Sequence, residues 1–213
     1  MKKTLLIILA VLVVLGVFVV GKYNTLVTYD ESVTTAWAQV ENVYQRRLDL
    51  IPNLVNTVKG AAAQESGVLI AVVNARANAT KVTVNIKDAQ SLAAFQQAQG
   101  EVSSSLSKLL AVAENYPTLQ SIQAFRDLMT QLEGTENRIT VERKNFNDAV
   151  NTKNIYIRKF PANIIAAMFG FEKSHQFEAK TWADVAPTVN FGSTPLAPDT
   201  IPTEGTDTEN VAH

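Results

Sequence analysis

The sequence predicts an all-α protein with an N-terminal transmembrane helix and four further helices, of which the first and the fourth are long. Three observations support this fold class. Two lysines at the N-terminus are followed by an uncharged apolar run, Thr4 to Gly21. Apolar residues then recur every three or four positions along most of the chain, which is the period of an amphipathic helix. A clear alternation of apolar and polar residues is confined to one short stretch, Lys81 to Ile86.

Residues 1–22 are predicted to anchor the chain in a membrane. As a helix rising about 1.5 Å per residue, the apolar run reaches across most of a hydrocarbon core about 30 Å thick. A cleaved signal peptide is the alternative, but no A-x-A-type site follows, and the chain has no cysteine for a lipidated terminus. We therefore interpret the segment as an uncleaved single-pass anchor. Lys2 and Lys3 favour a cytoplasmic N-terminus and place the remaining chain outside the cytoplasm, although Lys22 weakens this asymmetry.

The first helix after the anchor is predicted over Tyr23 to Gly60. Its apolar stripe consists of Leu26, Val33, Trp37, Val40, Tyr44, Leu48, Ile51, Val55, Val58 and Ala62. Because the stripe keeps its phase across Pro52, we interpret the helix as continuous, with a kink at this proline. Proline has no N–H group, so the carbonyl of Leu48 loses its helical partner. We expect a nearby group to use that carbonyl or the bend.

The second helix is predicted from about Gln64 to Asn78. Lys81 to Ile86 follows and is rich in β-branched residues, as a short strand would be. Since a single strand is not stable alone, we favour an extended connector. The alternative is a strand in a sheet made with Pro187 to Phe191 or with another subunit.

Asp88 is predicted to cap a third helix that ends near Glu114, and the fourth helix is predicted over Thr118 to Lys159. Residues 161–186 begin with a compact apolar segment. Residues 187–213 are rich in Pro, Thr, Gly and Asp and contain no basic residue. That composition predicts a disordered acidic tail.

Six motifs, which occur in the same order, resemble the LemA family of bacterial membrane proteins over about Tyr23 to Lys180. They are "YNTLV", "AWAQVENVYQRRLDLIPNLVNTVKG", "ENYPTLQ", "LEGTENRI", "RKNFNDAVN" and "FPANIIAAMFGF". The resemblance implies an antiparallel up-down four-helix bundle over residues 23–160, no established enzymatic activity, and a place in the bacterial cytoplasmic (inner) membrane. Some relatives take part in building magnetosome membranes, which points toward membrane organisation. The sequence departs from the family pattern at Gln64, at Gly134 and at Lys153, which replaces a common tyrosine.

The expected bundle geometry predicts a polar layer. If the first and fourth helices lie antiparallel with matched ends, the numbers of facing residues should add up to about 181 to 183. Arg46 then faces Glu136 or Asn137. The predicted layer consists of Arg46, Arg47, Asp49, Thr135, Glu136 and Asn137. The simpler alternative is that both arginines are merely solvated, one on each side of the apolar stripe.

The same geometry places the end of the fourth helix beside the membrane. This end carries the basic residues Arg143, Lys144, Lys153, Arg158 and Lys159 against one acid, Asp148, and positive charge there would favour anionic headgroups. The apolar residues that follow are Ile164, Ile165, Met168, Phe169 and Phe171. We interpret them as a segment that contacts the bilayer or a neighbouring subunit, with a cap on the base of the bundle as the alternative.

Composition and motifs argue against several classes of function. The formal net charge is −1, which leaves no obvious nucleic-acid surface, and the absence of cysteine excludes thiol chemistry. Glu172 and His175 have the Glu-x-x-His spacing of di-iron bundles, but such sites need a second pair and further carboxylates. We therefore expect no metal, no cofactor and no small-molecule substrate.

The sequence favours a non-enzymatic membrane protein whose bundle self-associates as a structural or remodelling scaffold. Its expected partners are the lipid bilayer and other copies of the chain. An adaptor or regulator that binds an exported or membrane partner in the cell envelope is the alternative. A carboxylate-based hydrolase using Glu41, Asp49 and Glu65 is a third reading, but nothing places two of these residues around a pocket.

Overall fold

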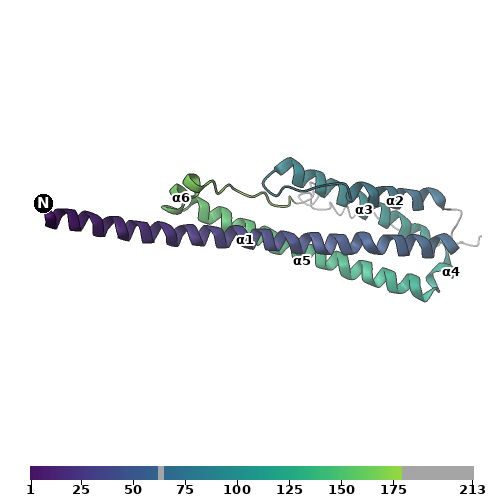
Figure 1. Cartoon of the computed structure of the whole chain (residues 1–213). Helices are drawn as coiled ribbons and strands as arrows, with labels where there is room; N and C mark the ends of the chain where they lie inside the picture. The colour runs from purple at the N-terminus through teal and green to yellow at the C-terminus, as the bar shows by residue number, and fades with distance from the viewer. Residues whose placement is uncertain (62–64, 179–213) are drawn as a thin grey trace, which may run out of the picture. The chain divides into compact units, whose positions relative to one another are not determined.

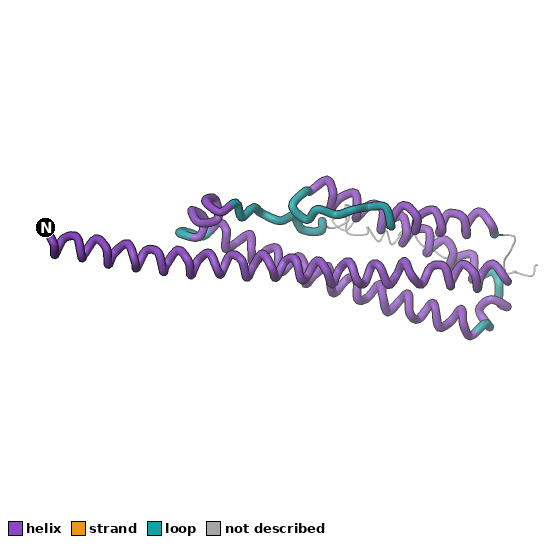
Figure 2. Tube along the Cα trace, viewed as in Figure 1, coloured by secondary structure: helices purple, strands orange, loops and turns teal. Residues whose placement is uncertain are grey.

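The described part of the protein, residues 1–61 and 65–178 of a computed structural model, consists of helices and loops (Figures 1 and 2). In chain order the helices are α1 (Lys2–Ala61), α2 (Ser66–Ala79), α3 (Ala89–Ala113), α4 (Pro117–Gln120), α5 (Gln123–Arg158) and α6 (Ala162–Phe169). No β-strand occurs in these residues, so the all-α fold class is confirmed for them. The predicted tail, 187–213, lies outside the described residues, as does the end of the 161–186 segment.

α1 joins the predicted anchor and the first predicted bundle helix in one helix from Lys2 to Ala61. Its N-terminal part projects beyond the other helices in Figure 1, and most large apolar side chains from Leu5 to Val20 are exposed. Among the described residues, this is the one helix that is long and apolar enough to cross a membrane. α1 also passes Pro52 without ending. The kink at Pro52 stays a prediction.

α5 runs antiparallel to α1, as two ion pairs show. Arg47 of α1 pairs with Glu136 of α5, and Asp30 of α1 pairs with Lys153 of α5. The residue numbers add up to 183 in both pairs, which lies within the range expected from the matched helix ends. The sequence-derived register is therefore correct for these two helices.

α2 and α3 form an antiparallel hairpin. The hydroxyl of Tyr116, just after α3, donates a 3.0 Å hydrogen bond to Glu65 Oε1, just before α2, so these two ends lie together. Asp88 Oδ1 accepts a 2.9 Å hydrogen bond from the backbone N–H of Gln90, which confirms the predicted cap of α3. Residues 81–86 form no strand and lie in the loop that connects α2 to α3. The alternative sheet partner, 187–191, lies outside the described residues.

The predicted start of the fourth helix is wrong. α4 ends at Gln120 and α5 begins at Gln123, instead of one helix that starts at Thr118. The carbonyls of Gln120 and Ser121 at this break accept hydrogen bonds of 2.9 and 3.0 Å from the Arg126 guanidinium. Arg126 thus supplies the donors that a continuous helix would have supplied.

The packed helices share a core that falls into three clusters along α1. The cluster farthest from the N-terminus includes Ile51, Val72, Val102, Leu119 and Leu128, from five helices. The middle cluster is aromatic and includes Trp37, Tyr44, Phe95, Phe146 and Phe177. The third cluster joins Leu26 of α1 to Ile165 and Ala166 of α6.

Candidate functional site

Six polar residues are buried in the described core, although burial of a polar side chain is unfavourable unless it finds partners. They are Arg47, Gln99, Ser105, Thr135, Lys153 and Ser174. Four of them belong to two networks, one around Arg47 and one around Lys153. We take these networks, together with the surface of α6, as the candidate functional site.

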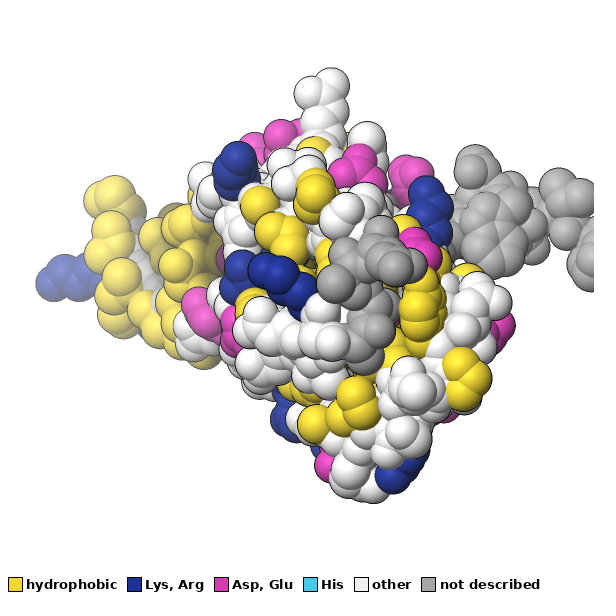
Figure 3. Space-filling model, turned by 90° about the vertical axis from the view of Figure 1, so that its right-hand side faces the viewer, with side chains coloured by type: hydrophobic (Ala, Val, Ile, Leu, Met, Phe, Trp, Pro, Cys, Tyr) yellow, Lys and Arg dark blue, Asp and Glu magenta, His cyan; other side chains and the backbone are white. Residues whose placement is uncertain are grey.

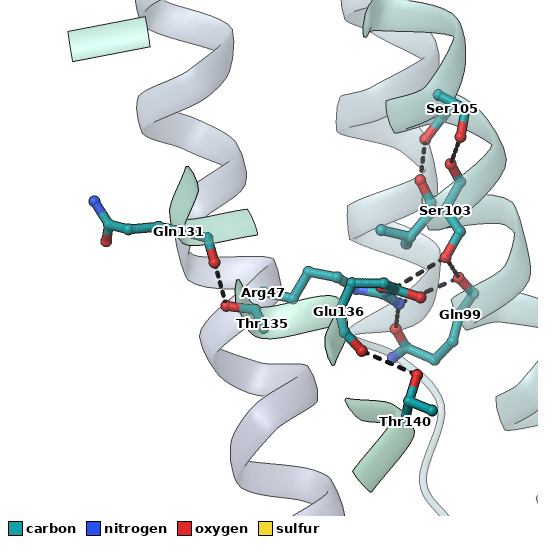
Figure 4. A network of polar contacts seen from close by, with 10 residues as sticks. Arg47, Gln99, Ser103, Ser105, Gln131, Thr135, Glu136 and Thr140 are labelled. Carbon is teal, nitrogen blue, oxygen red and sulfur yellow. Dashed lines mark hydrogen bonds and ion pairs between the residues drawn. The ribbon is translucent and has the colours of Figure 1, made fainter. Parts of the chain in front are cut away.

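The Arg47 network consists of Arg47, Gln99, Ser103 and Glu136, from α1, α3 and α5 (Figure 4). Nη1 of Arg47 donates to Ser103 Oγ at 2.9 Å and to Glu136 Oε2 at 3.0 Å, while Nη2 donates to the backbone carbonyl and the side-chain Oε1 of Gln99. The side chain of Arg47 is 3% exposed, whereas that of Glu136 is 56% exposed. The guanidinium therefore lies in the interior and its counter-ion lies at the surface.

The structure brings together only part of the predicted polar layer. Glu136 pairs with Arg47 and not with Arg46, so the expected pairing is corrected by one residue. Arg46 and Asn137 are both exposed. Thr135 is buried but donates to the Gln131 carbonyl in its own helix, and Asp49 accepts from Gln45 in α1. Arg47 instead of Arg46 faces the interior because of the phase of α1: Arg47 lies three residues after buried Tyr44 and four before buried Ile51.

Burial raises the pKa of Tyr44 above its ordinary value, and this effect outweighs the opposing influence of Arg143 and Arg47. The Arg47 guanidinium lies over the Tyr44 ring, with its central carbon 5.0 Å from the ring centroid. Tyr44 is therefore a neutral phenol at physiological pH. Its ring adds a cation–π contact to the hydrogen bonds that hold Arg47.

The carbonyl left free by Pro52 has the partner that the sequence led us to expect. Nε of Arg76, in α2, donates a 2.8 Å hydrogen bond to the backbone oxygen of Leu48. This confirms that a nearby group uses the Leu48 carbonyl. The proline therefore creates an acceptor on α1 to which α2 is attached.

Replacement of Arg76 by alanine is expected to lower the free energy of unfolding by about 1 to 3 kcal/mol, because the Leu48 carbonyl would be left without a partner. In a Pro52→Ala background the cost should shrink, since the N–H of residue 52 can then bond to Leu48. A double-mutant cycle measured by thermal unfolding should show a coupling of at least about 0.5 kcal/mol. Additive effects would mean that Arg76 stabilises the protein by another route.

The Lys153 network consists of Lys153 in α5, Asp30 in α1 and Ser174. Nζ of Lys153 lies 2.6 Å from Asp30 Oδ1 and donates to Ser174 Oγ at 2.9 Å. Lys153 is 1% exposed. Its predicted place on a basic surface beside the membrane is therefore wrong, because the ammonium is directed inward to a carboxylate.

Two other residues of the predicted basic end also make contacts within the protein. Lys144 pairs with Asp148 at 2.7 Å, and the guanidinium of Arg143 lies 4.6 Å from the centroid of the Phe177 ring. Arg158 and Lys159 are exposed at the end of α5. The basic charge available to a bilayer is thus smaller than the sequence suggested.

Residues 172–178 form an extended strap that lies along α5 (Figure 2). The side-chain amide of Asn154 both donates to and accepts from the backbone of Ser174, and that of Asn147 does the same for Phe177. Seven helical residues span about 10.5 Å, and three extended residues span about 10 Å. The two asparagines therefore match the strap in length and hold Phe177 in the aromatic cluster, where it is 6% exposed.

α6 has one buried face and one exposed face. Ile165 and Ala166 pack on Leu26 of α1, so this part of the predicted apolar segment caps the base of the packed helices. Three large apolar residues of α6 and the preceding Phe160 are exposed, and we call these four residues the α6 surface: Phe160, Ile164, Met168 and Phe169, at 80%, 54%, 65% and 51% exposure. Phe171 is partly buried against the same cluster as Ile165.

The α6 surface lies at the level where α1 leaves the packed helices. The ring of Tyr23 in α1 is 4.9 Å from that of Phe169 and 5.7 Å from that of Phe171, measured between centroids. Exposed Arg158 and Lys159 immediately precede the α6 surface in the chain. Apolar side chains flanked by basic ones, next to the end of an apolar helix, are typical of a membrane–water interface.

The carboxylates considered for a hydrolase, Glu41, Asp49 and Glu65, lie apart in the described residues. No group of three His, Asp or Glu side chains that could hold a metal ion occurs among them. Asp49 bonds to Gln45, Glu65 bonds to Tyr116, and Glu41 is exposed. On the face that Figure 3 shows, acidic, basic and hydrophobic side chains are mixed.

Comparison with known proteins gives a consistent picture. A family model described as the LemA family matches residues 36–191. Magnetosome proteins MamQ 1 and MamQ 2 of Paramagnetospirillum magneticum are each 30% identical over 182 residues, which covers 76% of this chain and 67% of theirs. Magnetosome protein MamQ of Magnetospirillum gryphiswaldense is 28% identical over 182 residues, with the same coverage.

Proposed function

Because the chain belongs to the LemA family, we propose that it is a non-enzymatic, single-pass membrane protein whose packed helices self-assemble at the bilayer as a structural or remodelling scaffold. The comparisons and the apolar N-terminal helix fit a membrane-associated helical protein. The further proposal is that copies of the chain associate and thereby organise the membrane. The similarity to magnetosome proteins supports a role at a membrane.

The continuity of α1 is the observation that carries this proposal. One helix includes both the apolar run and the buried residues of α1 from Leu26 to Val58. A helix without a flexible linker transmits tilt and rotation from the packed helices to the membrane-spanning part. Copies that pack together would therefore also set the relative orientation of their anchors, which is what a membrane scaffold requires.

We propose that the packed helices form an antiparallel up-down four-helix bundle made by α1, α2, α3 and α5. All four helices contribute buried residues to the cluster around Ile51 and Val102. We further propose that the bundle lies on the extracytoplasmic side of the bacterial inner membrane, because Lys2 and Lys3 favour a cytoplasmic N-terminus.

The α6 surface is expected to contact lipid. Because the chain has no cysteine, Met168→Cys can be labelled with a single fluorophore and reconstituted in vesicles that contain brominated and anionic lipids. Bromine should quench this label, since the exposed Met168 side chain belongs to the interfacial segment. The matched control is Thr140→Cys, at an exposed position on α5 far from α6, where little quenching is expected.

Equal quenching at the two positions would contradict the contact between α6 and lipid. The Thr140→Cys variant also reports the orientation of the chain. An impermeant maleimide should label it in intact cells, and protection until the membrane is opened would place the packed helices in the cytoplasm.

An adaptor that binds another envelope protein is the second candidate. The strap favours it, because extended peptides are commonly recognised through their main-chain hydrogen bonds, and Asn147 and Asn154 bond to the main chain of the strap. An adaptor need not self-associate, so the native mass of the extracted protein separates the two candidates.

A further inference from the structure

The outer face of α2 lacks charge. The helix contains a single charged residue, Arg76, and its Nε is used to bond to Leu48 of α1. The exposed residues of α2 are Ser66, Gly67, Ile70, Ala71, Val73, Asn74 and Asn78. A surface helix normally opposes its buried face with charged residues, so this face needs an explanation outside the packed helices.

Two β-branched side chains dominate the α2 face. Ile70 is 57% exposed and Val73 is 47% exposed. They border a groove of about 490 Å³ that is also lined by Val55 and Lys59 of α1 and by Leu69 of α2. The walls of the groove are therefore mostly apolar, and Lys59 brings a flexible basic side chain whose ammonium can remain in water.

We propose that the α2 groove is the contact surface for a second copy of this chain, with the two α2 helices side by side and parallel. This inference deepens the proposed scaffold function and rests on it. Two copies anchored in one bilayer by α1 share the same direction across the membrane. A symmetric pair must then have its two-fold axis along the membrane normal.

This symmetry favours the α2 face because its exposed residues are uncharged. Near a two-fold axis along the membrane normal, each side chain meets its own copy, so a charged residue there faces an identical charge. The exposed faces of the other long helices carry such residues, for example Arg46 and Asp49 on α1, Glu101 on α3, and Glu133 and Arg138 on α5.

The α2 face instead places neutral groups at the axis. Ile70 and Val73 would bury apolar surface against their copies, and the Asn74 amide can both donate to and accept from its copy. Self-pairing through the α2 face therefore avoids like-charge repulsion at the axis.

Cysteine cross-linking in native membranes tests the contact. Asn74→Cys should form a disulfide-linked dimer on mild oxidation, because position 74 lies near the axis. Thr140→Cys on α5 is the matched control and should not. Adding Ile70→Glu and Val73→Glu to the Asn74→Cys chain should lower the cross-linked fraction at least about tenfold, which corresponds to about 1.4 kcal/mol of lost association.

The outcomes separate this inference from the proposed function. Because both side chains are exposed, the Ile70→Glu, Val73→Glu variant should keep its thermal unfolding midpoint, and loss of cross-linking with that midpoint retained supports the α2 contact. A wild-type chain that assembles while Asn74→Cys stays unlinked would overturn the α2 contact and leave the scaffold in place. A monomeric wild-type chain would overturn both. Adducts of Asn74→Cys with a different protein would assign the groove to another partner.

Discussion

Replacement of Asp30 by alanine is expected to lower the free energy of unfolding by about 3 to 5 kcal/mol, the typical cost of removing one partner of a buried ion pair. Lys153 is 1% exposed, and Asp30 is the carboxylate beside its ammonium, at 2.6 Å. Ser174 Oγ would remain as a partner, but a hydroxyl does not neutralise the charge. For a chain of this size, the loss corresponds to a decrease in thermal midpoint of about 6 to 20 °C.

Two further variants make this test specific. Glu31→Ala removes an exposed acid at the next position and should change stability by less than about 0.5 kcal/mol. Asp30→Ala combined with Lys153→Met should recover most of the loss, because an apolar side chain needs no counter-ion. If the double variant is as unstable as Asp30→Ala alone, the unpaired ammonium is not the cause.

Replacement of Arg47 by alanine is expected to cost about 2 to 5 kcal/mol, because a buried side chain is removed and buried acceptors lose their donor. The change leaves a cavity and removes the donor shared by Gln99 and Ser103, both in α3. Glu136→Ala should cost about 1 kcal/mol or less, because the Glu136 side chain is 56% exposed and its charge is screened by water. The measurement is the unfolding midpoint of each purified full-length variant in detergent.

The neighbouring arginine supplies the control for this prediction. Arg46→Ala removes the same charge and the same side chain from an exposed position, and its effect should stay within about 0.5 kcal/mol. Equal destabilisation by Arg46→Ala and Arg47→Ala would contradict the burial of Arg47. A larger effect of Glu136→Ala than of Arg47→Ala would contradict the described division between a buried cation and a surface anion.

The period of the buried residues in α1 also includes Arg47. Val40, Tyr44, Ile51, Leu54 and Val58 are all buried, and Arg47 fits their alternation of three and four. A stripe through Leu48 and Val55 has the same period and leaves Arg47 at its side. The neighbouring Leu48 is also buried, so the apolar pattern alone does not single out one of them.

Lys153 was also predictable in part. It lies three residues after buried Val150, which puts it in phase with the apolar stripe of α5. The register expected from the helix ends assigns it a partner between residues 28 and 30, and Asp30 is the acid there. A lysine in the phase of a core stripe, opposite an acid, is therefore a usable sign of a buried pair.

The strap could not be predicted from local pattern. Residues 172–178 have neither helical nor strand periodicity, and their position depends on Asn147 and Asn154, which are distant in the sequence. The break before α5 is likewise not indicated by the local sequence pattern. The break at Ser121 and Ile122 contains neither of the usual helix breakers, proline and glycine. The carbonyls of Gln120 and Ser121 instead accept hydrogen bonds from the side chain of Arg126.

Self-assembly of the packed helices at the membrane is tested by the native mass of the full-length chain. The protein would be extracted in mild detergent, and its mass determined by light scattering with the detergent contribution subtracted. We expect an assembly of several 23.2 kDa chains that survives dilution, and a smaller mass for the Ile70→Glu, Val73→Glu variant. A wild-type mass of one chain at every concentration would show that the packed helices do not self-assemble.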